Sequence, residues 1–358
     1  MNTLFQPLLV GGLELPNRLA MAPMTRSRAN ADGTQTPMAV EYYRQRADAG
    51  LLITEAVAVS HEGRGYPNIP GLWMPEHETV WREVARAVHA SGGRVFMQLF
   101  HTGRIGHSSL LPGLPQGPSA VAPEGKVMDA SFAMRPYETP AAMDAAAIRN
   151  AVDAFRIAAG RAVALGMDGV ELHAANGYLI DQFLRDGANR RDDGYGGSIV
   201  KRMRFLVEVV EAVRTEIGSD RIGVRISPWS GFNSMADSDP DALFQQVARK
   251  LDLMGIAYLH LIEKGEWNEE RTEATDMIRT AFSGPLMANS GYTPQRAIEA
   301  IREGRADLVS FGVPYLANPD LVFRVLHGEA LNPANSSTFY GGGAEGYLDY
   351  PILEPARR

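Results

Sequence analysis

A chain of 358 residues, 45% hydrophobic and 22% charged, is long enough for two ordinary domains or for one large α/β barrel. Its net charge of −7 argues against nucleic acid as a partner, and the absence of cysteine excludes disulfides, zinc–thiolate sites and cysteine nucleophiles. The sequence contains no apolar run of about 18 residues, the length that predicts a membrane span, and no signal peptide pattern, so we expect a cytoplasmic protein.

Short apolar runs recur along the chain, and most are followed by a polar loop and a helical pattern. Fully buried parallel strands have this appearance because helices cover both faces of the sheet. The runs are residues 19–23, 51–57, 94–100, 169–173, 222–226, 258–262, 286–289 and 308–311. These strand–helix units favour a single (β/α)8 TIM barrel that spans residues 1–358. A doubly wound sheet is the alternative, although no Gly-x-Gly-x-x-Gly motif follows the first strand.

Two helices and two irregular segments can be placed between these strands. Asp144 is predicted to cap a helix that ends near Gly166, and Ser198 to cap one whose apolar positions recur at steps of three and four. Residues 101–143 are rich in proline and glycine, which predicts an excursion over one face of the barrel after the third strand. Residues 332–351 form a C-terminal tail that either folds back onto the body or stays loose.

Side chains that follow the strands of a barrel share its C-terminal face, where the active sites of such barrels lie. Thr25, Gln98 and Arg225 occupy three of these positions. A threonine, a glutamine and an arginine form a rim of hydrogen-bond donors suited to a flat heterocycle with several carbonyls and ring nitrogens. Each residue alone would more often be structural, and their coincidence at successive strand ends favours a binding site.

The fourth run leads directly into a second group of polar side chains. His173, Asn176 and Tyr178 fall within six residues of one another. Two hydrogen-bond donors beside a proton donor can polarise a carbonyl group and protonate the neighbouring carbon.

This fourth-strand segment, residues 170–184, resembles the substrate-binding segment of the Old Yellow Enzyme family of flavin-dependent ene-reductases. Further matches cover almost the whole chain, at residues 21–28, 96–104, 224–228, 317–321 and 340–347. The resemblance implies that non-covalent FMN, reduced by NADH or NADPH, supplies a hydride from N5 in a ping-pong cycle. It also implies activated alkenes as substrates: α,β-unsaturated carbonyls, maleimides and nitroalkenes, with nitrate esters as a further candidate.

The resemblance assigns roles to individual residues. His173 and Asn176 are expected to donate hydrogen bonds to the substrate oxygen, and Tyr178 to deliver a proton from the face opposite the flavin. The residues expected to bind FMN are Pro23, Thr25, Ala56, Gln98, Arg225, Ser290, Gly291, Gly312 and Val313. The aromatic residues expected to line the substrate site are Tyr66, Phe100, Trp267 and Tyr347.

Two positions depart from the family pattern. Phe100 stands where a tryptophan is common, which leaves a smaller wall without an N–H donor. Val313 stands where the family usually has an arginine that binds the FMN phosphate. The phosphate then depends on backbone N–H groups near Ser290, Gly291 and Gly312. A bidentate arginine contact is among the stronger hydrogen bonds, so we predict weaker FMN binding than in arginine-bearing relatives, unless another cation reaches the site.

Two other functions stay open. A non-redox barrel lyase or isomerase would use His173 and Tyr178 as an acid–base pair, and a non-catalytic flavin-binding protein would show no turnover. Larger barrel relatives that reduce thioesters need an iron–sulfur cluster, which the absent cysteines exclude. His101 and His107 are interpreted as structural, and no metal site is predicted. We expect a small-molecule substrate and a monomer or homodimer.

Overall fold

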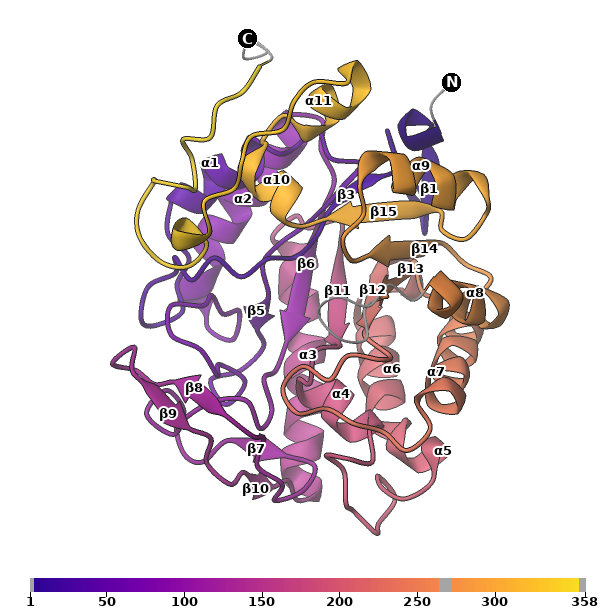
Figure 1. Cartoon of the computed structure of the whole chain (residues 1–358). Helices are drawn as coiled ribbons and strands as arrows, with labels where there is room; N and C mark the ends of the chain where they lie inside the picture. Colours follow the sequence, from indigo (N-terminus) through magenta and orange to yellow (C-terminus); the bar gives the residue numbers. More distant parts are fainter. Residues whose placement is uncertain (1–2, 264–271, 354–358) are drawn as a thin grey trace.

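Parallel strands close into a barrel, in which each strand pairs with the next and the last pairs with the first (Figure 1). The computed structural model describes residues 3–263 and 272–353. The barrel strands are β3 (Leu19–Met21), β4 (Leu51–Ile53), β6 (Val95–Phe100), β11 (Gly169–Ala174), β12 (Ile222–Ile226), β13 (Tyr258–Ile262), β14 (Leu286–Asn289) and β15 (Leu308–Phe311). Every predicted run coincides with or overlaps one of these strands, and the closed order confirms the TIM barrel over the doubly wound sheet.

Helices cover the outside of the barrel in Figure 1. They are α1 (Met38–Arg44), α2 (Glu78–Ala90), α3 (Ala145–Ala164), α4 (Leu179–Leu184), α5 (Ile199–Arg202), α6 (Arg204–Ile217), α7 (Pro240–Met254), α8 (Thr272–Ala281), α9 (Pro294–Arg302), α10 (Val313–Ala317) and α11 (Leu321–His327). Short 3-10 turns cover Thr3–Phe5, Pro75–His77, Ser219–Arg221 and Ser336–Thr338. No helix within the described ranges combines the length and apolarity that crossing a membrane requires.

Both predicted helices form where expected. The Asp144 carboxylate accepts a hydrogen bond from the backbone N–H of Ala147 at 2.8 Å, which caps α3. The helix predicted from Ser198 is divided at Met203 into α5 and α6, but the backbone at Met203 stays helical, with φ −70° and ψ −16°. Gly218 ends α6 with φ 87°.

A short hairpin of β1 (Leu8–Val10) and β2 (Leu13–Leu15) packs against the inside of the barrel. Val10 and Leu15 are fully buried and belong to one apolar cluster with inward-pointing residues near the strand starts, among them Phe96 and Met287. The hairpin therefore fills the N-terminal end of the barrel, and the opposite end is left for polar side chains.

The predicted excursion after the third strand contains four short strands. β7 (Gln116–Gly117) pairs in parallel with β10 (Ala141–Ala142), and β8 (Lys126–Met128) forms an antiparallel hairpin with β9 (Met134–Pro136). A further short strand, β5 (Val57–Ala58), extends the barrel sheet beside β6. Figure 1 shows the excursion at the end of the molecule opposite the N terminus.

The C-terminal tail, residues 332–351, folds back onto the body. Arg26 donates to the carbonyl oxygens of Phe339 at 2.9 Å and Gly346 at 2.8 Å. The Tyr347 ring stacks on Tyr42 with 4.1 Å between centroids and 9° between planes. Of the two alternatives for the tail, the bound one is therefore correct.

Candidate active site

The end of β11 holds the histidine of the predicted site, and the loop that follows holds the asparagine and leads to the tyrosine. Asn176 has φ 58° and Gly177 has φ 74°, so two successive left-handed residues turn the chain back. A side chain at Gly177 would meet Met235 at 2.7 Å and Asn233 at 2.8 Å. Tyr178 then starts α4 with its ring 4.8 Å from the His173 ring, centroid to centroid.

Hydrogen bonds fix this loop to its neighbours. The N–H of Asn176 donates to the Ser227 hydroxyl at 2.8 Å, and its carbonyl oxygen accepts from the Asn233 side chain at 2.8 Å. The N–H of Gly177 donates to the Asp181 carboxylate at 2.9 Å. The Asn176 carboxamide itself has no hydrogen bond with any residue that the structure describes. Its backbone is fixed while its amide stays available to a ligand.

Aromatic side chains surround the His173–Tyr178 pair. Phe100, at the end of β6, lies 5.3 Å from Tyr178 and 6.3 Å from His173, measured between ring centroids. Tyr66 lies 6.4 Å from Tyr178, and the two hydroxyls are 3.4 Å apart. The structure thus brings together four of the predicted residues, which arrive from three separate stretches of chain.

Burial sets the protonation of this pair. His173 is 4% exposed, and its pKa is well below the ordinary value because of burial and, secondarily, the positive charge of Arg225. The imidazole is therefore neutral at pH 7. Burial raises the pKa of Tyr178 to about 12, so its phenol keeps its proton. The site holds a neutral hydrogen-bonding ring beside a proton donor.

Gln98 and Arg225 are both buried, at 2% and 7% exposure, and lie in β6 and β12 on either side of β11. Gln98 donates an N–H to the Glu171 carboxylate at 2.8 Å, and Arg225 donates to the Asn289 side-chain oxygen at 3.0 Å. Arg225 is the register partner of His173. Two residues of the predicted donor-rich rim, Gln98 and Arg225, thus lie on the two strands that flank β11.

Pro23, Thr25 and Ala56 lie at the ends of β3 and β4 and are joined through Glu55. The buried Glu55 carboxylate accepts from the backbone N–H of Arg26, the residue after Thr25, at 3.1 Å. Pro23 and Thr25 are partly exposed, and Ala56, directly after Glu55, is 5% exposed. One carboxylate thus holds the ends of two neighbouring strands in register.

Comparisons with known proteins agree with this arrangement. The sequence model of the NADH:flavin oxidoreductase / NADH oxidase family matches residues 3–332. The chain belongs to that family. It is 41% identical over 98% of both chains to a Leishmania infantum protein named "probable flavin mononucleotide-dependent alkene reductase". It is 39% identical to 12-oxophytodienoate reductase 2 of Arabidopsis thaliana, with 98% of this chain and 96% of that protein covered.

Solved structures give the same result. Morphinone reductase superposes with a TM-score of 0.95 at 42% identity, covering 100% of this chain and 98% of the other. The Old Yellow Enzyme homologue from Zymomonas mobilis superposes with a TM-score of 0.95 at 39% identity, over 98% and 100% of the chains. The predicted Old Yellow Enzyme resemblance is confirmed, and the protein is an FMN-dependent oxidoreductase.

The residues of this flavin oxidoreductase suit its cofactor. Arg225 Nε and His173 Nδ1 are buried without a hydrogen-bond partner in the structure. Such atoms are uncommon in folded proteins, because leaving a buried polar group unpaired costs about 1–3 kcal/mol. An isoalloxazine ring carries carbonyl oxygens and ring nitrogens that can accept from Arg225, and the oxygen of a bound substrate can accept from His173.

The expected phosphate region lies after β14 and β15. Ser290 and Gly291 have φ values of 118° and 62°, and Gly312 precedes α10. Val313 is 47% exposed and brings no charge. Arg296, in the first turn of α9, donates to the Gly291 carbonyl oxygen at 3.2 Å. Sequence reasoning missed this arginine because it belongs to the helix after the loop.

The substrate-lining prediction is only partly matched by the placement of the residues. Tyr347 is fully buried between Tyr42 and the guanidinium groups of Arg26 and Arg28, and the structure does not bring it to the His173 cluster. A different tail residue, Tyr340, is 69% exposed, and it makes a minor contribution to the raised pKa of Tyr178, which burial dominates. Trp267 lies outside the described residues.

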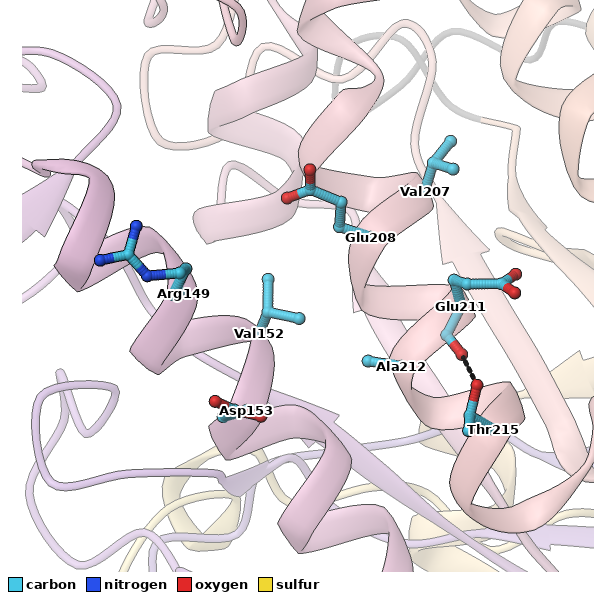
Figure 2. Close-up of a pocket in the computed structure, with 8 residues that line it drawn as sticks. All are labelled: Arg149, Val152, Asp153, Val207, Glu208, Glu211, Ala212 and Thr215. Atoms are coloured by element: carbon cyan, nitrogen blue, oxygen red, sulfur yellow. Dashed lines mark hydrogen bonds between the residues drawn. The ribbon is translucent and has the colours of Figure 1, made fainter.

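Two further features lie apart from the active site. A cavity of about 450 Å³ opens between α3 and α6 on the helical shell, with Arg149 and Asp153 on one side and Glu208 and Glu211 on the other (Figure 2). None of its lining side chains belongs to the predicted site. Within residues 3–263 and 272–353, no group of three or more metal-ligating side chains has a geometry suited to a metal ion.

Proposed function

We propose that this chain is an NAD(P)H-dependent ene-reductase that reduces activated alkenes: α,β-unsaturated carbonyls, maleimides and nitroalkenes, with nitrate esters as a further class. The observation that carries the proposal is the His173–Tyr178 pair. A buried neutral imidazole with an unpartnered nitrogen lies 4.8 Å, ring to ring, from a buried phenol that keeps its proton. The names of the alkene-reducing relatives support the same reaction class.

His173 at the end of β11, and Asn176 and Tyr178 in the segment that follows, each have a defined task in this proposal. His173 and Asn176 donate hydrogen bonds to the carbonyl or nitro oxygen, where negative charge builds during reduction. Loss of one such donor typically slows a reaction by about 10²–10³. Tyr178 holds the proton that the α-carbon receives. Bound FMN, reduced by NADH or NADPH, supplies hydride chemistry.

The proposed cofactor contacts follow from the strand ends. Pro23, Thr25 and Ala56, which lie at the two strand ends that Glu55 joins, contact one edge of the flavin ring. Gln98 and Arg225 contact its pyrimidine part. The phosphate is bound by backbone N–H groups of the residues after β14 and β15, which are Ser290, Gly291, Gly312 and Val313.

Aromatic side chains form the walls of the proposed substrate site. Tyr66 and Phe100 provide two of them, because both rings pack around Tyr178. Tyr347 would have to leave its packing against Tyr42 to form a further wall. Trp267 lies outside the described residues, and its place beside the substrate stays a prediction.

Anaerobic mixing tests the reaction and the role of Tyr178. NADPH should bleach the yellow holoprotein, and 2-cyclohexenone should then restore the colour. Tyr178→Phe should leave bleaching largely intact and slow re-oxidation by about 10²–10⁴, the usual contribution of a positioned proton donor. Tyr195→Phe is a matched control, because it removes a phenol that donates only to Glu208, at 2.9 Å on the helical shell.

The outcomes separate the proposal from its alternatives. A Tyr178→Phe variant that is no longer reduced by NADPH would show that the tyrosine has another role. A protein that bleaches but is not re-oxidised by any activated alkene would be a flavoprotein of different activity. A colourless protein that takes up no FMN would favour the lyase or isomerase. Family membership favours the oxidoreductase.

We further propose that residues 1–358 act as one FMN-binding domain and that the protein is a monomer or a homodimer. Light scattering of the holoprotein measures its mass directly. A larger assembly would contradict this part of the proposal.

A further inference from the structure

A chain of hydrogen bonds runs through the inside of the barrel from Arg225 toward Glu171. Arg225 Nη2 donates to Asn289 Oδ1 at 3.0 Å, and Asn289 Nδ2 donates to Ser310 Oγ at 2.8 Å. Ser310 Oγ lies 2.8 Å from His260 Nε2, and His260 Nδ1 lies 2.8 Å from Glu171 Oε2. Four successive contacts therefore connect strands β12, β14, β15, β13 and β11.

A second arm reaches Glu171 from the other side. Gln98 Nε2 donates to Glu171 Oε1 at 2.8 Å, and the Tyr258 hydroxyl donates to Glu171 Oε2 at 3.0 Å. Glu171, His260 and Tyr258 are completely buried. Both residues proposed to face the flavin pyrimidine are thus connected to one fully buried carboxylate, Gln98 directly and Arg225 through three intervening side chains.

The directions of the bonds in the network follow from its two charged ends and from the protonation state of His260. An arginine only donates, and an ionised carboxylate only accepts. Asn289 must therefore accept through oxygen and donate through nitrogen, and His260 must turn its Nδ1 proton toward the Glu171 carboxylate. Burial lowers the pKa of His260, so the ring is neutral at pH 7 and its Nε2 accepts from the Ser310 hydroxyl.

This direction settles which atoms of Gln98 are free. One N–H of its amide is held by Glu171, and its carbonyl oxygen has no hydrogen bond with a described residue. The free oxygen and the second N–H form an acceptor–donor edge. The pyrimidine part of an isoalloxazine presents the complementary edge, an N–H beside carbonyl oxygens.

We propose that Glu171 is a positioning residue for the flavin site: it orients the Gln98 amide directly and the Arg225 guanidinium through His260, Ser310 and Asn289, and its negative charge lowers the reduction potential of bound FMN. This inference rests on the proposed contacts of Gln98 and Arg225 with the flavin. Reduced flavin gains negative charge, which a buried carboxylate disfavours and Arg225 favours. Glu171 thus balances the charge of Arg225 without itself contacting the cofactor.

Glu171→Gln tests the proposal, because it removes the charge and nearly preserves the volume. The midpoint potential of FMN in the purified holoprotein should rise by at least about 30 mV, which is a tenfold change in the ratio of the dissociation constants of oxidised and reduced FMN. Oxidised FMN should also bind about tenfold more weakly. The introduced amide can donate as well as accept, so it no longer forces Gln98 to present its N–H to position 171 and its carbonyl oxygen to the flavin. Tyr258→Phe is the matched control: it removes one hydrogen bond to Glu171 but neither its charge nor its link to Gln98.

A double-mutant cycle separates this role from a merely structural one. If Glu171 acts through Gln98, Glu171→Gln should have little further effect on the affinity for oxidised FMN in a Gln98→Ala background. Equal effects in both backgrounds, or an unchanged potential in folded Glu171→Gln, would overturn the proposal.

Ser310→Ala provides a second test if Glu171→Gln does not fold, because it interrupts the arm to Arg225 by removing a single hydroxyl. FMN should bind several-fold more weakly to this variant, and wild-type affinity together with wild-type potential would overturn the inference. Failure of the proposed function would be seen in a different measurement. In that case the reduced FMN of the wild-type holoprotein would not be re-oxidised by activated alkenes.

Discussion

Acid should destabilise this protein through His101, the residue that follows β6. Its side chain is 2% exposed, and its Nδ1 accepts a hydrogen bond from the N–H of Gly103 at 3.0 Å. An imidazolium has no acceptor at this atom, so protonation breaks the bond. Burial lowers the pKa of His101 to about 4, against a smaller opposing effect of Glu62.

The size of the effect follows from linkage. The unfolded chain takes up this proton with a pKa near 6.5, so between about pH 6.5 and pH 4 the unfolded state binds more protons than the folded state. Stability is therefore unaffected above this window and falls as the pH drops through it. For His101 alone, the free energy of unfolding should decrease by about 2 kcal/mol between pH 7 and pH 5, and by about 3 kcal/mol below pH 4.

His101→Asn isolates this contribution, because the asparagine oxygen can accept the Gly103 N–H and does not titrate. Urea titrations followed by tryptophan fluorescence, with saturating FMN at pH 7 and pH 5, give the two free energies for each protein. Other buried histidines, such as His173 and His260, are present in both proteins, so their contributions to the free energy of unfolding cancel in the comparison. The wild type should lose about 2 kcal/mol more than the variant. Equal losses would refute the assigned burial and protonation of His101.

Three further predictions concern the cofactor site, the catalytic pair and the tail. Val313→Arg should tighten FMN binding by at least about tenfold, and Arg296→Gln should weaken it. Both dissociation constants can be measured by flavin fluorescence quenching. An unchanged constant for Arg296→Gln would exclude this arginine from the phosphate site. Re-oxidation by cyclohexenone should not vary between pH 6 and pH 9, since His173 is neutral and the pKa of Tyr178 is about 12, and an inflection there would contradict these assignments. Tyr347→Ala should lower the free energy of unfolding by about 3–5 kcal/mol and open residues 332–351 to proteolysis, whereas an unchanged digestion pattern would show that other contacts hold the tail.

The barrel could be predicted from the sequence because its strands are buried on both faces. Such strands appear as short apolar runs, and the runs at 222–226, 258–262, 286–289 and 308–311 coincide with the observed strands residue for residue. The run at 51–57 is divided into β4 and β5, since Glu55 turns inward to bind the N–H of Arg26. The acidic residue Glu55 inside an otherwise apolar run was the feature of the sequence that could have predicted the end of β4.

The candidate site was predictable where its residues are close in sequence, as in the His173–Tyr178 segment. The network around Glu171 was not, because it depends on register: Glu171 lies opposite Gln98, and Arg225 lies opposite both His173 and His260. A single chain does not reveal which residues of neighbouring strands meet. The charged and polar residues in the middle of the runs at 169–173 and 258–262 could have drawn attention to it.

The position of the Tyr347 ring could not be predicted from the sequence for a related reason. Tyr340 and Tyr347 belong to one glycine-rich segment, and only the path of the backbone decides that the Tyr347 ring is buried against Tyr42 while Tyr340 is exposed. Arg26 and Arg28 hold that path by binding carbonyl oxygens between Thr338 and Gly346. Several left-handed glycines, among them Gly341 with φ 68°, permit it.

The pairing of the first barrel strand, β3, with the last, β15, and the binding of the tail by Arg26 have a consequence for biosynthesis. Arg26 and Gly346 are 320 positions apart, so the edge of the site that carries Thr25 is completed only after almost the whole chain has left the ribosome. Contacts between such distant partners form slowly, and until then the apolar strand edges are open to association with other chains. Newly made chains should therefore acquire flavin late, as one of the last events of maturation.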